Sequence, residues 1–213
     1  MHHLENIQKL FRRNFVESPL LETYEAGNIM LPAGRLVACD PLLTNNMKPF
    51  VTDFPKGSFP VNIHRERDSG CIAYVEIVFS SAEVKNWKMA TTEGQITEDL
   101  KDGEIFGYPV ESGMGCFMDA ETQDDLNRLE IKLFRRKGDD FMGIYEEFFH
   151  GYFFDSPGAA NQYAFLKPDE NKDGNICAFE TGYGEGFYAS YIGFDEAGRP
   201  AKVVSEFIEI LTD

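Results

Sequence analysis

The chain has 213 residues, of which 43% are hydrophobic and 19 are Phe, so it can bury one large apolar interior. Its formal net charge is −16, and nucleic acids and anionic membranes repel such a polyanion, which excludes both as favoured partners. The same charge is compatible with a basic protein partner, with cations or with solubility alone.

The first half of the chain predicts one short helix followed by strands. Apolar residues at positions 4, 7, 10, 11 and 15 recur at helical spacing, which predicts an N-terminal helix within residues 1–17. Residues 71–79 are apolar on almost both faces of an extended chain, so this stretch predicts the central strand of a sheet. Further strands are expected at 35–39, 59–64, 86–92 and 105–111, with surface loops at 42–56 and 92–104.

The middle of the chain predicts a helical pair at about 120–150. Asp119 or Thr122 can cap a first helix, and Gly138 ends it. The two helices are indicated by apolar stripes, one at Leu126, Leu129, Leu133 and Phe134 and one at Phe141, Ile144, Tyr145, Phe148 and Phe149.

From Tyr163 onward the pattern indicates strands joined by tight turns, among them a hairpin of 187–194 and 202–211 around the turn 195–198. The expected fold class is therefore α+β: a mainly antiparallel β-sheet, as a sandwich or a strongly curved sheet, with the helical pair inserted and a short N-terminal helix. No internal repeat or linker divides the chain, so we expect a single domain over 1–213 with a β-rich body at 18–213.

The cysteines, the N-terminus and the longest apolar runs indicate where the protein resides. Cys39, Cys71, Cys116 and Cys177 stand beside apolar residues and form no Cys-x-x-Cys pair, which predicts reduced, buried thiols and no zinc site. The N-terminus is charged and lacks the apolar run of a signal peptide, and no run reaches the roughly eighteen apolar residues of a membrane span. We expect a soluble, cytoplasmic protein.

Residues 169–180 match the pattern of an EF-hand calcium loop, with Asp169, Asn171, Asp173 and Glu180 at ligand positions. Pro168 and strand-like flanks exclude the helices that an EF-hand needs, and Asn-Lys-Asp-Gly suits a tight turn. The sequence therefore predicts a β-hairpin here, and we expect neither a metal nor a cofactor.

Two glycine-rich stretches, 110–119 and 182–188, place carboxylates beside paired glycines, and we expect them to meet in space. The carboxylates could converge for acid–base chemistry or cation binding, or each could cap a helix or hold a turn. For Glu185 we expect a structural or recognition role, with its carboxylate accepting backbone N–H groups. The candidate binding or structural site comprises Asp40, Glu111, Ser112, Gly113, Asp119, Gly182, Gly184, Glu185, Gly186 and Tyr188.

No catalytic signature accompanies these residues. Ser112 precedes a glycine but lacks the Gly-x-Ser-x-Gly pattern, and the internal histidines, His64 and His150, show no metal-ligand spacing.

Three motifs together resemble the bacterial family called domain of unknown function 4241. They are residues 31–42 (Leu-Pro-Ala-Gly-Arg-Leu-Val-Ala-Cys-Asp-Pro-Leu), 110–119 and 182–188. The family's Gly-Asp-Gly and Asp-Ala-Gly correspond here to Gly184-Glu185-Gly186 and Glu111-Ser112-Gly113, so each acid is longer by one methylene. The resemblance implies a fold and a bacterial origin, with no established activity.

Two functions are favoured from the sequence, ahead of a third, a calcium-stabilised domain, which rests on residues 169–180. One is a binding or interaction protein that neutralises a basic protein partner such as a toxin, which the negative charge favours because opposite fields speed association. The alternative is a hydrolase-like enzyme that uses Glu111, Asp119 and Glu185 beside the glycine-rich loops.

Overall fold

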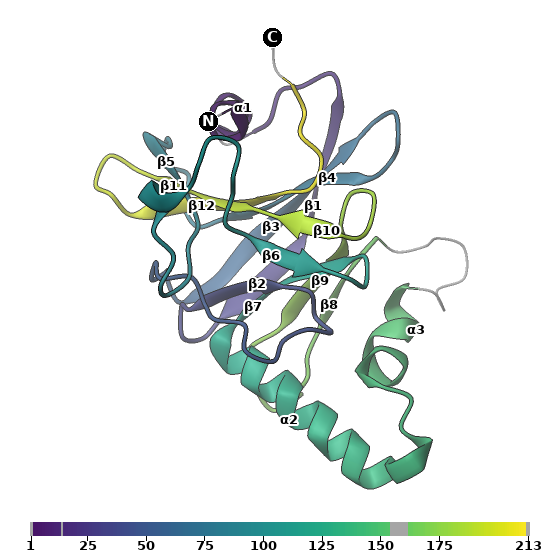
Figure 1. Cartoon of the computed structure of the whole chain (residues 1–213). Coiled ribbons are helices and arrows are strands. Elements are labelled where there is room, and N and C mark those ends of the chain that lie inside the picture. The colour runs from purple at the N-terminus through teal and green to yellow at the C-terminus, as the bar shows by residue number, and fades with distance from the viewer. Residues whose placement is uncertain (1, 14, 154–161, 212–213) are drawn as a thin grey trace.

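Two antiparallel sheets packed face to face form the body of the protein, which is described by a computed structural model over residues 2–13, 15–153 and 162–211 (Figure 1). The six-stranded sheet has the order β1-β3-β4-β12-β11-β5, and the four-stranded sheet has the order β2-β7-β9-β8. A third, two-stranded sheet pairs β10 with β6. The predicted α+β class with mainly antiparallel sheets is confirmed.

The chain passes between the sheets several times. The strands are β1 (Leu21–Leu31), β2 (Leu36–Cys39), β3 (Gly57–Glu66), β4 (Ile72–Val78), β5 (Asn86–Met89), β6 (Tyr108–Val110), β7 (Met114–Asp119), β8 (Tyr163–Leu166), β9 (Ile176–Glu180), β10 (Gly186–Tyr188), β11 (Ser190–Phe194) and β12 (Pro200–Glu206). The helices are α1 (His2–Phe11), α2 (Ala120–Lys137) and α3 (His150–Phe153), with short turns of helix at η1 (Thr97–Asp99), η2 (Gly138–Asp140) and η3 (Tyr145–Phe149).

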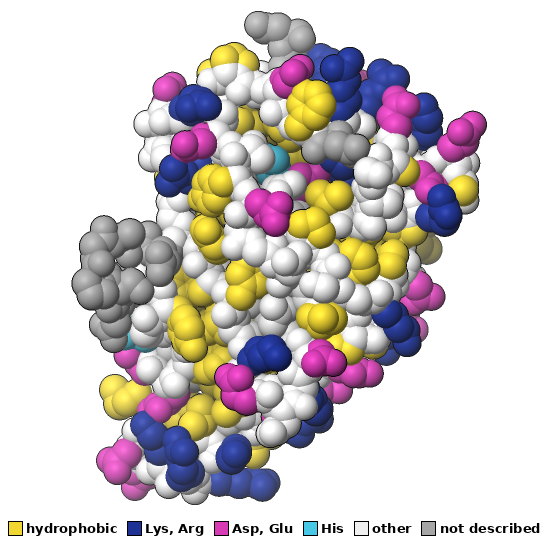
Figure 2. Space-filling model, turned by 180° about the vertical axis from the view of Figure 1, so that it is seen from behind, with side chains coloured by type: hydrophobic (Ala, Val, Ile, Leu, Met, Phe, Trp, Pro, Cys, Tyr) yellow, Lys and Arg dark blue, Asp and Glu magenta, His cyan; other side chains and the backbone are white. Residues whose placement is uncertain are grey.

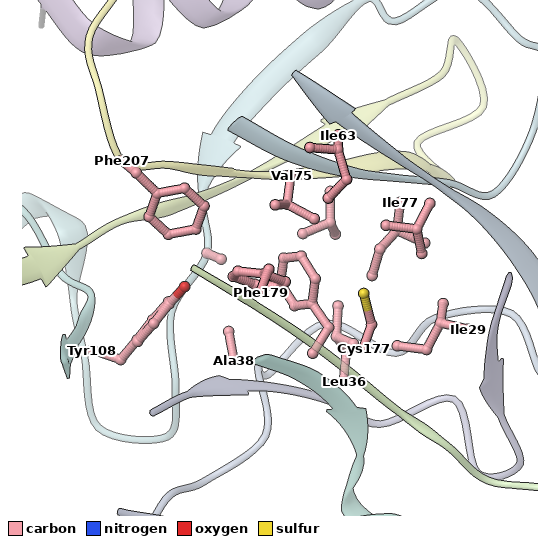
Figure 3. Close-up of a cluster of buried hydrophobic side chains, with 14 of the residues drawn as sticks. Ile29, Leu36, Ala38, Ile63, Val75, Ile77, Tyr108, Cys177, Phe179 and Phe207 are labelled. Carbon is pink, nitrogen blue, oxygen red and sulfur yellow. The ribbon is translucent and has the colours of Figure 1, made fainter. Parts of the chain in front are cut away.

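The main core lies between the two large sheets. Figure 3 shows side chains of β3 and β4 facing side chains of β2 and β9 across this layer. Phe117 and Phe179 meet edge to face with ring centroids 5.5 Å apart, a favourable geometry for buried aromatic rings. The labelled members of this layer are Ile29, Leu36, Ala38, Ile63, Val75, Ile77, Tyr108, Cys177, Phe179 and Phe207.

Helices cover the outer faces of both large sheets, so the protein has helix, sheet, sheet and helix layers (Figure 1). Ile7, Leu10 and Phe11 of α1 pack on the six-stranded sheet. On the other side, α2, η3 and α3 bury their apolar stripe on the four-stranded sheet. The short N-terminal helix and the helical insertion at 120–153 are therefore as predicted, although the second helix is only an η3–α3 segment.

Two strand predictions differ from the structure. The longest strand, β1, was not predicted because Glu22, Glu25 and Gly27 favour strands poorly; it forms as an edge strand with a bulge between Glu25 and Gly27. The predicted strand at 187–194 is two strands, β10 and β11, in different sheets. They separate at Ala189, which is buried and whose carbonyl accepts a hydrogen bond from Glu206 N.

The face opposite the view of Figure 1 carries hydrophobic side chains across its middle and charged side chains of both signs at its two ends (Figure 2). None of the helices in the described part of the chain is long and apolar enough to cross a membrane.

A buried ion pair lies within the six-stranded sheet, and its lysine also bonds the chain that follows α1. Lys202 Nζ lies 2.6 Å from Glu76 Oε1 and donates a second hydrogen bond of 2.6 Å to the carbonyl of Arg13. His64 Nε2 lies 3.4 Å from Glu76 Oε2, and Asn62 donates to the same oxygen. Burial raises the pKa of Glu76, but His64, Lys202 and Asn62 outweigh it and hold the pKa at about 2.

Replacing Lys202 by Met should destabilise the protein by about 3–5 kcal/mol at neutral pH, because the Glu76 carboxylate would stay buried without its cation. Urea unfolding measures this change. Lys85→Met is the matched control, since Lys85 pairs with Glu83 on the surface, and it should change stability little.

Because the pKa of Glu76 is lower in the folded than in the unfolded chain, this contribution is complete above pH ~4.5 and is lost as the pH falls toward 2. An equal loss of stability in Lys202→Met and Lys85→Met would contradict the assignment.

Candidate functional site

Asp119 ends β7 and holds the turn that leads into β2. Its Oδ2 accepts hydrogen bonds from the backbone N–H groups of Ala33, Gly34 and Arg35 at 3.0, 2.9 and 3.3 Å. Its Oδ1 accepts from Glu121 N, so the same carboxylate caps α2. The side chain is fully buried, and both oxygens are committed to backbone donors.

Asp40 holds a second turn, at the opposite end of the strand pair. It follows β2, and its Oδ2 accepts from Glu111 N at 2.9 Å and Ser112 N at 2.8 Å, in the turn that leads into β7. Its Oδ1 accepts from Ser112 Oγ and Leu42 N, both at 2.9 Å. Asp40 is also fully buried, so four donors surround a carboxylate that solvent does not reach.

We call Asp40 and Asp119 the two carboxylate clamps. The strands β2 and β7 pair antiparallel, from Leu36 opposite Asp119 to Cys39 opposite Cys116, so the clamps stand at opposite ends of this pair. The two ends of β7 are about 17 Å apart at the rise per residue of an antiparallel strand. The structure therefore does not bring Asp119 together with the other candidate residues.

The two glycine-rich stretches meet, as expected. β10 pairs with β6 so that Gly186 lies opposite Val110. The Cα of Gly184 lies 3.7 Å from the point where a Cβ of Gly113 would stand. Thr181 N donates to the carbonyl of Gly113 at 3.0 Å, which fixes the start of the 182–186 turn against the 111–113 turn.

Tyr188 closes the second turn. Its hydroxyl donates to the carbonyl of Gly184 at 2.8 Å, and its ring packs edge to face on Phe207. A Cβ at Gly186 would stand 2.7 Å from the Tyr188 ring, and Gly184 adopts a φ of 109°, so both positions require glycine. Tyr188 and these glycines together fix the shape of the turn.

Glu111 and Glu185 are both exposed to solvent. They flank the Gly186–Val110 pair at which the β10–β6 ladder ends. The expectation that the Glu185 carboxylate accepts backbone N–H groups is wrong: no hydrogen bond joins it to any residue that the structure describes. The backbone groups of the first turn are bonded to Asp40 instead.

A groove of about 550 Å³ opens beside the two turns, between the end of the four-stranded sheet and the η3–α3 segment. It brings together parts of all three motifs: Leu42 at the end of the first, Ser112 to Met114 of the second, and Gly182 to Gly184 of the third. The remaining lining residues are Cys71, Tyr145, Phe153, Glu180 and Thr181.

Glu180 in this groove was predicted only as the last position of a calcium loop. In the structure β8 and β9 form an antiparallel hairpin, which confirms the predicted strand flanks of 169–175. The Asp169 carboxylate accepts from the backbone and side-chain N–H groups of Asn171, as in a tight turn. Within the described residues, no three His, Cys, Asp or Glu side chains are arranged to hold a metal ion.

The structure also shows how far the cysteines are buried and what Ser112 bonds to. Cys39, Cys116 and Cys177 are buried, as expected, but Cys71 is half-exposed and lines the groove. Burial raises the pKa of the Cys116 and Cys177 thiols. Ser112 Oγ donates to Asp40 and accepts from Met114 N at 3.2 Å, which is a turn arrangement and not that of a serine nucleophile.

Comparison with known proteins gives one match. The family model described as "Protein of unknown function (DUF4241)" matches residues 29–205. The match includes both carboxylate clamps and both glycine-rich turns, and it leaves out α1. No curated protein and no solved structure matches the chain.

Removing the Asp40 clamp should destabilise the protein, whereas removing Glu185 should not. Asp40→Ala leaves the N–H groups of Glu111 and Ser112, which now bond to a buried carboxylate, without these acceptors, and we expect a loss of about 3 kcal/mol. Asp40→Asn keeps one acceptor and should lose less. Thermal and urea unfolding measure both changes.

Glu185→Ala and Glu111→Ala are the matched controls, since each removes one carboxylate from the same region. Both should unfold at the parent's midpoint, because their side chains are exposed and bonded to none of the residues that the structure describes. A loss of stability in Glu185→Ala as large as in Asp40→Ala would contradict this assignment of roles.

Proposed function

The chain belongs to the DUF4241 family, whose function is unknown, and we propose that it is a binding protein that recognises a basic protein partner. The recognition surface is the glycine-turn face, which we define as Glu111, Tyr183, Glu185 and Phe187 with the groove beside them. Of these residues, Tyr183 and Phe187 are 73% and 51% exposed.

The observation that carries this proposal is the division of the carboxylates into two groups. Asp40 and Asp119 are buried and hold backbone turns, so neither has an oxygen free for chemistry. Glu111 and Glu185 are exposed, and no hydrogen bond or ion pair joins either side chain to a residue that the structure describes, so nothing there holds either carboxylate in place for acid–base chemistry. A hydrolase-like use of these acids finds no support in this arrangement.

Exposed aromatic rings beside the acids favour protein recognition. Strand alternation places Tyr188 inward on Phe207 and its neighbour Phe187 outward, beside Glu185. Tyr183 extends from the turn between Gly182 and Gly184, and its hydroxyl donates to the Glu66 carboxylate at 3.2 Å. Aromatic anchors ringed by polar groups are typical of the energetic centre of protein interfaces.

The net charge of −16 adds a long-range attraction for a positively charged partner. Such attraction raises association rates, and it weakens as salt screens the charges. A binding protein built this way needs no cofactor and no reacting group.

Selection from a displayed random-peptide library tests the proposal without knowledge of the partner. We expect enriched sequences to be basic and to contain apolar residues that meet Tyr183 and Phe187. Their binding should fall in a variant that combines Glu111→Gln with Glu185→Gln, and it should weaken as the salt concentration rises.

The matched control combines Glu170→Gln with Glu196→Gln, which removes the same charge from two exposed turns elsewhere. The control should bind the enriched peptides like the parent. Enrichment of neutral or acidic peptides, or equal losses in the two double variants, would overturn the proposal.

A further inference from the structure

The groove beside the glycine turns contains a half-buried carboxylate, that of Glu180. Along β9, Cys177 and Phe179 point into the main core, whereas Ala178 packs under the helical segment. The alternation of a strand places Glu180 on the same side as Ala178, at the open end of the helix-covered face. Its carboxylate therefore faces the groove.

No ion pair joins Glu180 to any residue in the described part of the chain. Burial raises the pKa of Glu180, and a hydrogen bond with Gln162 offsets only part of that effect. Glu76 provides the contrast, since that buried carboxylate is paired with Lys202 and bonded by Asn62.

Aromatic side chains form the walls around Glu180. Tyr145 comes from η3, Phe153 from the end of α3 and Tyr183 from the glycine turn. Aromatic faces attract cations, and they stack well on the flat guanidinium group. Glu66, bonded to the Tyr183 hydroxyl, adds a second carboxylate at the rim.

We propose that this groove binds an arginine side chain of the basic partner, with the guanidinium paired to Glu180 and stacked on the aromatic walls. The inference rests on the proposed function, which it deepens by naming the group that enters the groove. Charge complementarity selects the occupant, because an anion would meet Glu180, Glu66 and the overall negative charge. A carboxylate and a guanidinium can form two parallel hydrogen bonds, which favours arginine over lysine.

The test uses NMR titration of the full-length, isotope-labelled protein with two capped pentapeptides, Gly-Gly-Arg-Gly-Gly and Gly-Gly-Gln-Gly-Gly. We expect saturable shifts of the amides of Met114, Tyr145, Glu180 and Tyr183 with the arginine peptide and none with the glutamine peptide. Glu180→Gln should weaken binding of the arginine peptide about tenfold, whereas Glu170→Gln, an exposed control, should leave it unchanged.

Tyr183→Ala provides a second variant that does not depend on a buried position, since Tyr183 is 73% exposed. It should weaken the arginine peptide and fold like the parent. Equal binding of the two peptides, or shifts that stay outside the groove in every titration, would overturn the inference.

The same titration separates this inference from the proposed function. Arginine-dependent shifts confined to Glu111 and Glu185 would reject the groove as the arginine site and keep the rest of the glycine-turn face as the recognition surface. Basic library peptides that bind nowhere on this face would reject both.

Discussion

The structure depends on two buried carboxylates. Each stands at the end of one strand of a pair and accepts hydrogen bonds from the turn that precedes the other strand. Asp119 at the end of β7 holds the turn before β2, and Asp40 at the end of β2 holds the turn before β7. Backbone N–H groups in turns at a buried edge must find acceptors, and a carboxylate provides several at once. Since β7 is also the strand on which β9 pairs, the clamps fix one wall of the groove.

The 182–186 turn depends indirectly on the same hydrogen bonds. Thr181 bonds to the carbonyl of Gly113, so the 182–186 turn rests on a loop that Asp40 has already fixed. The exposed acids, Glu111 and Glu185, then project from a rigid base. The family resemblance implies shorter acids at these two positions. An added methylene meets no obstacle here because both side chains point into solvent.

Local patterns were enough to predict much of the fold. Residues 71–79, apolar on both sides, form the central strand β4, and the stripe from Leu126 to Leu133 predicts α2. The strand β1 could not be predicted from local patterns, because Glu22 and Gly27 have a weak preference for strands. Its pairing with β3 outweighs that preference. The break at Ala189 is set by which sheet each neighbour joins, and no local pattern encodes that choice.

The candidate site was predicted as a set of residues but not as an arrangement. The meeting of the two glycine-rich stretches was expected, yet the clamps join positions more than seventy residues apart, such as Asp40 and Ser112. Sequence alone could not separate carboxylates that hold turns from those that face solvent. Glu180 could have been found from the alternation of β9, which sets it on the face of Ala178.

Amide hydrogen exchange measured by NMR tests whether the two buried carboxylates hold their turns. The amides of Ala33, Gly34, Glu111 and Ser112 lie in turns, where exchange is fast unless a buried acceptor holds the hydrogen. We expect these four amides to exchange as slowly as those inside β7, because each donates to a buried carboxylate. Exchange at the rate of free turns would contradict it.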